Sequence, residues 1–139
     1  MESFRLRAAR PLPDMLIERA QESLRAAELC LEARLVNSAA SRAYYAMFQA
    51  AHVALEAAGV ARARWSHPAL QAAFTTELID RRRVYPSAFR AHLSIALGVR
   101  HTADYGAVGV SSTVANRMVR RAAAFVSAVQ DGAGHGPKH

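Results

Sequence analysis

The chain of 139 residues is poor in several residue types that define common classes of protein. It contains one cysteine, Cys30, which excludes a disulfide framework and a cysteine-based metal site. Only 7 glycines and 5 prolines interrupt it, and no apolar run approaches the ~20 residues of a membrane span. The first residues lack the apolar segment of a secretory signal. We therefore expect a cytoplasmic protein that contacts no membrane and uses no metal or cofactor.

The residues that are abundant favour helices. Alanine and arginine dominate the composition, and apolar residues recur three and four positions apart with no strand-like alternation. Residues that cap or break helices divide the chain into the expected helices. These residues are Asp14, Asn37 or Ser38, Ser66, Ser87 and Gly59. These helices cover residues 13–34, 38–58, 66–80, 87–104 and 111–130. Five helices joined by short loops predict an all-α, antiparallel up-down bundle over residues 1–130, followed by a flexible tail over 131–139.

The positive charge of the chain is unevenly distributed. The net charge is +7, yet residues 1–56 are balanced, so the whole excess lies in residues 57–139. Almost all of it is arginine, because Lys138 is the single lysine. Two interpretations remain open: these arginines form solvated helix faces, or they attract a polyanion such as RNA. The arginines in question are Arg62, Arg64, Arg81, Arg82, Arg83, Arg117, Arg120 and Arg121.

One arginine lies where the periodicity predicts an apolar side chain. Arg100 continues the stripe of Phe89, Leu93 and Ala96 in the helix expected over 87–104. A charge on such a face is costly unless it is paired or faces a solvated groove. Asp104 follows one turn later and can reach Arg100, and Tyr105 ends the helix. The pair either fixes the packing register or belongs to a functional site.

The helix expected over 38–58 carries a second, polar stripe. It consists of Arg42, Tyr45, Gln49, His52 and Glu56. Adjacent helical residues point about 100° apart, so Tyr44 is expected to pack inside while Tyr45 faces a partner or ligand. By the same count His101 is rotated away from Arg100 and more exposed. His67, in the first turn of the next helix, is either a simple helix-start residue or a catalytic group.

Phosphate-loop, dinucleotide-binding and zinc-protease motifs are absent from the sequence. Other segments nevertheless resemble the small HEPN-domain proteins of prokaryotes. They are NSAASRAYYAMFQAAHVALEAAG over residues 37–59, the helix start Ser66-His67, and LGVRHTADYG over residues 97–106. The combination of S-R-x-Y-Y-A-x-F-x-A on one helix with R-x-x-A-D-Y on a later one is distinctive.

The resemblance implies a five-helix HEPN bundle that forms a homodimer through the 38–58 and 87–104 region. It also implies a metal-independent endoribonuclease that leaves a 2′,3′-cyclic phosphate. The resemblance further implies that the protein is a component of a toxin–antitoxin system. Its partner in such a system would be a minimal nucleotidyltransferase that acts as the antitoxin. Arg100 would be the arginine of the family's R-x(4–6)-H motif, and the two copies would hold the scissile phosphate.

The sequence departs from this motif at the histidine. Residues 105–107 are Tyr105, Gly106 and Ala107, and tyrosine is a poor general base at neutral pH. The candidate catalytic residues are therefore Arg100, Asp104 and Tyr105. Candidate binding residues are Arg42, Tyr45, His67 and His101. Two alternatives remain. In the first, the protein is a non-catalytic module that binds a nucleotidyltransferase and a nucleotide or RNA, and Tyr105 is the acceptor for modification. In the second, the protein is an RNA-binding adaptor that uses the arginine clusters.

Overall fold

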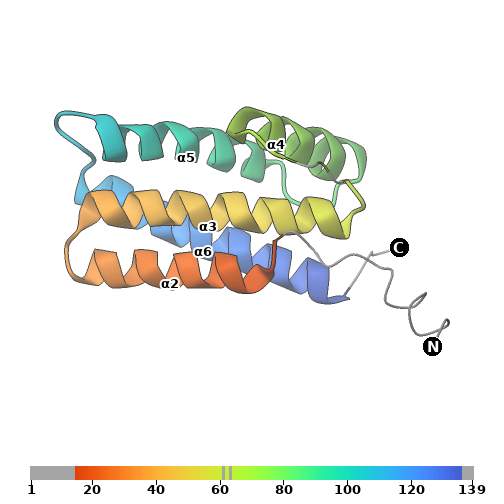
Figure 1. Cartoon of the computed structure of the whole chain (residues 1–139), viewed down its shortest axis with the longest axis horizontal. Helices are drawn as coiled ribbons and strands as arrows, with labels where there is room; N and C mark the ends of the chain where they lie inside the picture. Colours follow the sequence, from red (N-terminus) through yellow and green to blue (C-terminus); the bar gives the residue numbers. More distant parts are fainter. Residues whose placement is uncertain (1–14, 61, 63, 136–139) are drawn as a thin grey trace.

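The computed structural model describes residues 15–60, 62 and 64–135. These residues form helices that are connected by short loops (Figure 1). The helices are α2 (Ile17–Glu32), α3 (Val36–Ala57), α4 (His67–Ala73), η1 (Phe74–Arg81), α5 (Ala88–Tyr105) and α6 (Ser112–His135). The π-helical segment η1 continues α4 without a break, so these residues form five helical rods and no strand. The prediction of an all-α, five-helix fold is confirmed.

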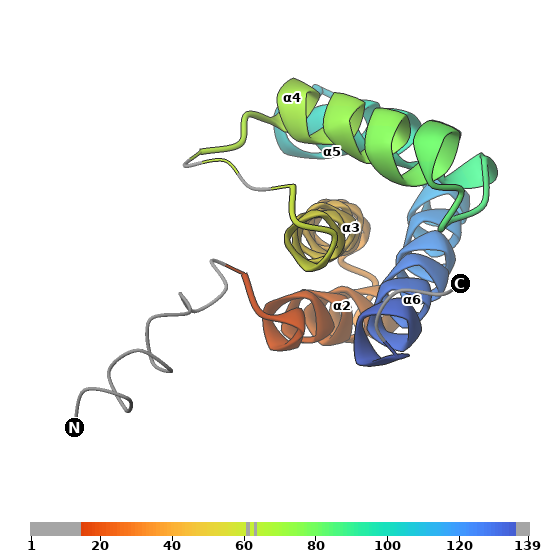
Figure 2. The same ribbon diagram turned by 90° about the vertical axis from the view of Figure 1, so that its right-hand side faces the viewer.

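Helix α3 lies at the centre of the bundle (Figure 2). It packs against α2 on one side, against α5 and the α4–η1 rod on the opposite side, and against α6. Consecutive helices α2 and α3 run in opposite directions, as do α5 and α6 (Figure 1). The α4–η1 rod differs from the predicted up-down pattern, because it lies across the direction of α3 (Figure 2).

The core is built from two kinds of side chain. The buried face of α3 is dominated by alanines, which let neighbouring helices approach its backbone closely. Toward η1, α5 and α6 the core is aromatic. The ring of Phe125 lies 4.5 Å from Phe89 and 5.2 Å from Phe74, and all three side chains are buried. No helix among the described residues is long and apolar enough to cross a membrane.

Several helix ends follow the sequence pattern. The Ser66 hydroxyl accepts a hydrogen bond from the Ala69 amide at 3.2 Å and caps α4 as predicted. Gly59 follows α3 with a φ of 82°, the left-handed conformation that glycine adopts without strain. Ser87 precedes α5, but its side chain makes no capping hydrogen bond.

The predicted cap of the central helix is wrong, although its start lies close to the predicted one. Helix α3 begins at Val36, before the predicted caps, and no side chain caps it. The Oδ1 atom of Asn37 instead accepts a hydrogen bond from the Val110 amide at 2.9 Å, which ties α3 to the loop before α6. The predicted cap Asp14 lies outside the described residues. At the other end of the chain, α6 extends past Gln130 to His135, and residues 136–139 of the predicted tail also lie outside them.

Candidate functional site

Arg100 lies where α5 crosses α3, and both helices contribute to its surroundings. Phe89, Leu93 and Ala96 bury the rest of the α5 stripe, and 18% of the Arg100 side chain remains exposed. Its Nη2 atom donates a hydrogen bond to the Tyr45 hydroxyl at 2.9 Å, and its Nε atom lies 3.1 Å from Oδ2 of Asp104. The predicted pairing of Arg100 with Asp104 is confirmed, and Tyr45 is its third member.

The guanidinium of Arg100 is held as a permanent cation. Burial alone lowers its pKa, but interactions with Tyr45, Asp104 and Tyr105 outweigh burial, so the pKa of Arg100 is raised. The buried Nε atom has no hydrogen-bond acceptor among the described residues, because the nearby Asp104 oxygen is not aligned with the N–H bond. Arg100 is therefore charged, held in place and not fully hydrogen-bonded.

A cavity of about 540 Å³ opens beside this pair. The Ser41 hydroxyl donates a hydrogen bond of 3.4 Å to Asp104 at its wall. Tyr105 is 68% exposed at the same cavity. Sequence analysis did not name Ser41 as a site residue, although Ser41 begins the S-R-x-Y-Y-A-x-F-x-A motif; its contact with Asp104 joins two helices and has no local signal. The cavity is lined by Cys30, Asn37, Ser38, Ser41, Arg42, Ala103, Asp104 and Tyr105.

Of the other candidate binding residues, Arg42 and Tyr45 lie beside Arg100, whereas His101 lies beside Tyr105. The guanidinium carbons of Arg42 and Arg100 lie 4.9 and 5.4 Å from the centre of the Tyr45 ring. Tyr45 thus contacts two cations through its electron-rich face. His101 is exposed, as predicted, and its ring lies 5.1 Å from that of Tyr105 rather than beside Arg100.

His67 enters the cluster from α4. Its Nδ1 atom forms a short hydrogen bond with the hydroxyl of Tyr44, whose side chain is 2% exposed. The His67 ring lies 4.6 Å from Phe48 and 6.4 Å from Tyr45. Burial, and secondarily the charge of Arg100, lower the pKa of His67. The inward position of Tyr44 is confirmed, but its pairing with a residue of another helix has no local sequence signal.

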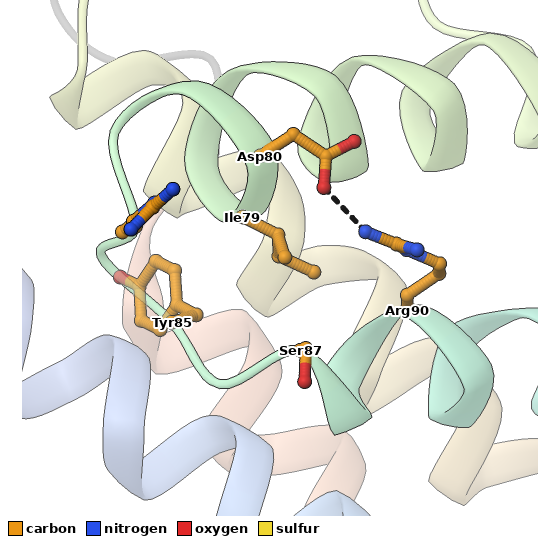
Figure 3. A pocket seen from close by; sticks show the side chains of 6 residues that line it. Ile79, Asp80, Tyr85, Ser87 and Arg90 are labelled. Carbon is orange, nitrogen blue, oxygen red and sulfur yellow. Dashed lines mark hydrogen bonds and ion pairs between the residues drawn. The ribbon is translucent and has the colours of Figure 1, made fainter.

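A second cavity, of about 370 Å³, lies between η1 and the start of α5 (Figure 3). Its lining contains none of the predicted site residues. Asp80 and Arg90 form an ion pair across it (Figure 3). Of the neighbouring arginine run, Arg81 pairs with Glu77 at 2.9 Å, and Arg82 donates to the Ala58 carbonyl at 2.8 Å. Part of the predicted basic surface is therefore engaged within the fold.

The described residues form a helical bundle in which one partly buried arginine lies between two helices and pairs with an aspartate that lines a polar cavity. No group of three or more metal-ligating side chains occurs within the described part of the chain. The family model of the HEPN domain matches residues 14–132, and the chain belongs to this family. The comparison with curated proteins found no match.

Proposed function

We propose that this protein is a HEPN-domain toxin–antitoxin component that cleaves RNA without a metal ion and pairs with a minimal nucleotidyltransferase. The observation that carries the proposal is the state of Arg100. Its guanidinium is charged and fixed by Tyr45 and Asp104, 18% of the side chain is exposed, and its partner Asp104 lines an open polar cavity. A planar cation with these properties suits a phosphodiester, which it binds through charge-assisted hydrogen bonds.

The chemistry follows from the groups next to Arg100. The guanidinium binds the nonbridging oxygens of the scissile phosphate and stabilises the charge that develops on them. The Asp104 carboxylate accepts the proton of the ribose 2′-hydroxyl as the 2′-oxygen attacks phosphorus. The bond from phosphorus to the 5′-oxygen breaks, and that oxygen takes a proton from solvent. The products are a 2′,3′-cyclic phosphate and a free 5′-hydroxyl, and Tyr105 contacts the RNA beside them.

The active form in this proposal is a homodimer through the α3 and α5 region. Large apolar side chains at one end of the bundle support it, since Leu35 is 55%, Tyr105 68% and Val108 97% exposed. Sedimentation analysis at micromolar concentration is expected to give a dimer, and Val108→Glu a larger monomer fraction. A wild-type chain that sediments as a monomer contradicts this part of the proposal.

The activity is tested by incubating the full chain with single-stranded RNA in excess EDTA. Wild type is expected to produce fragments that end in a cyclic phosphate. Arg100→Ala is expected to lose at least a hundredfold in rate, because it removes the phosphate-binding cation. Arg25→Ala is the matched control, since it removes an arginine of α2 whose side chain is 63% exposed and is expected to keep the activity. Equal rates for the two variants contradict the assignment.

A second candidate function is a non-catalytic partner module, favoured by the high exposure of Tyr105 at the position where the family motif has histidine. In this case the nucleotidyltransferase binds the cavity end of the bundle and uses the Tyr105 hydroxyl as acceptor. Co-expression with neighbouring genes, followed by intact-mass measurement with ATP, tests it. A nucleotide adduct that Tyr105→Phe abolishes supports it, and an unchanged mass with an active transferase contradicts it.

A further inference from the structure

His67 is the histidine that the fold brings into the Arg100 cluster, although it lies outside the R-x-x-A-D-Y segment. It comes from α4, whose first turn is fixed by the Ser66 cap. The rings of Tyr44, Tyr45 and Phe48 surround it at centroid distances of 5.5, 6.4 and 4.6 Å. A side chain so enclosed keeps one orientation, and its two ring nitrogens have different surroundings.

The hydrogen bond with Tyr44 selects one tautomer of the imidazole. The Tyr44 side chain is buried, and its hydroxyl has no other hydrogen-bond partner among the described residues. If this hydroxyl accepted a hydrogen bond from Nδ1–H, its own O–H would be buried without an acceptor, which is costly. Burial also raises the pKa of Tyr44, so its hydroxyl keeps its proton. Tyr44 therefore donates to Nδ1, and a neutral His67 carries its proton on Nε2.

The Nε2 atom of the half-buried His67 has no hydrogen-bond partner within the described part of the chain and keeps contact with solvent, unlike the buried Nε2 of His52 and Nδ1 of His92. The charged group that acts on the ring is Arg100 from α5, and the titratable groups beside it are the neutral phenols of Tyr44 and Tyr45 from α3. His67 thus presents an N–H donor to solvent next to the cationic site.

We propose that His67 is a phosphate-binding residue of this site, which donates its Nε2–H to the RNA backbone held at Arg100. The inference rests on the proposed action on RNA, and it gives His67 the role of a neutral donor rather than of a general base. A histidine that already carries the proton on its outward nitrogen cannot accept another there in its neutral form. Tyr44 is the positioning residue that fixes this state.

The tautomer is tested on the free protein, independently of any activity. Long-range ¹H–¹⁵N spectra of the full chain at pH 7.5 are expected to place the His67 proton on Nε2. In Tyr44→Phe the hydrogen bond to Nδ1 is lost, and the signals are expected to shift toward a mixture of tautomers. A proton on Nδ1 in the wild-type chain overturns the inference.

Binding is tested with a single-stranded 2′-O-methyl RNA oligonucleotide, which lacks the attacking hydroxyl and remains intact. His67→Gln retains a donor close to the Nε2 position and is expected to bind within about threefold of wild type. His67→Asn retains only a group near Nδ1 and is expected to bind about ten- to hundredfold more weakly, the effect of losing a hydrogen bond to a charged group. Circular dichroism verifies that both variants fold.

The outcomes separate this inference from the proposed function. If wild type cleaves RNA and His67→Asn binds the oligonucleotide as tightly as wild type, the role of His67 is refuted and the nuclease assignment stands. If His67→Gln loses as much affinity as His67→Asn, the outward donor is not what binds, and the inference is again refuted. If the wild-type chain binds no RNA, both proposals fail.

Discussion

Arg100 and Asp104 form one ion pair, yet removing the one or the other is expected to have unequal effects on stability. The side chain of Arg100 is 18% exposed and that of Asp104 is 29% exposed, so the pair is neither fully buried nor a simple surface pair. Exposed pairs contribute about 0–1 kcal/mol, whereas breaking a buried pair costs about 3–5 kcal/mol. For Asp104→Ala, which leaves the cation without its counter-ion, we expect a loss of about 1–2 kcal/mol in the free energy of unfolding.

Arg100→Met keeps the aliphatic stem and removes the charge whose burial is unfavourable. Asp104 then remains beside solvent and the Ser41 hydroxyl, which limits the cost of leaving it unpaired. We expect this variant to be as stable as wild type within about 0.5 kcal/mol, since apolar replacement of a buried ionic group is often neutral or stabilising. Its RNA cleavage is expected to disappear.

Urea denaturation followed by circular dichroism measures both effects, with Arg117→Met as the control for loss of one exposed arginine. The midpoint of thermal unfolding is expected to fall by roughly 3–8 °C in Asp104→Ala and to change little in Arg100→Met. If Arg100→Met is destabilised as much as Asp104→Ala, Arg100 is chiefly a structural member of the pair. The reasoning that assigns it to ligand binding would then be refuted.

Three further predictions concern the fold. Phe125→Ala removes a buried ring that contacts Phe89 and Phe74 and should cost about 3–5 kcal/mol in urea denaturation; a loss below 1 kcal/mol would contradict the described aromatic core. Gly109→Ala should lower the thermal midpoint, because φ is 83° and a Cβ atom would lie 2.6 Å from Oδ1 of Asn37; an unchanged midpoint would contradict this contact. Burial lowers the pKa of both His67 and His92 below the ordinary histidine value of 6.5. Below pH 6.5 the unfolded chain therefore binds more protons than the folded chain, and the free energy of unfolding should fall as the pH drops from 7.5 to 5.5. His92→Gln should reduce this difference in thermal midpoint, and an equal difference in the variant would argue against His92 as a source.

Much of the fold is predictable because it depends on local patterns. Helical periodicity places the five rods and the inward face of Tyr44, and the residue type of Ser66 places the cap of α4. The contact between Arg100 and Asp104 is predictable for the same reason, since residues four apart on a helix are neighbours. These features need no knowledge of how distant segments meet.

The remaining features depend on tertiary packing. The direction of the α4–η1 rod depends on its packing against α3, α5 and the aromatic core, and this packing has no periodic signal. The hydrogen bonds of Tyr45 with Arg100 and of Tyr44 with His67 join residues of different helices. Asn37 was predicted as a helix cap from its residue type, but a backbone amide 73 positions away binds its side chain.

The alanine-rich core of α3 has a consequence for how this protein can change during evolution. Seven of the buried residues of α3 are alanines, and they occupy the space between its backbone and the neighbouring helices. Replacing one of those that face α5 by valine or leucine would push α5 outward and lengthen the distance between Tyr45 of α3 and Arg100 of α5. Sequence drift that enlarges these positions would therefore weaken the site from a distance, while every residue of the site itself stays the same.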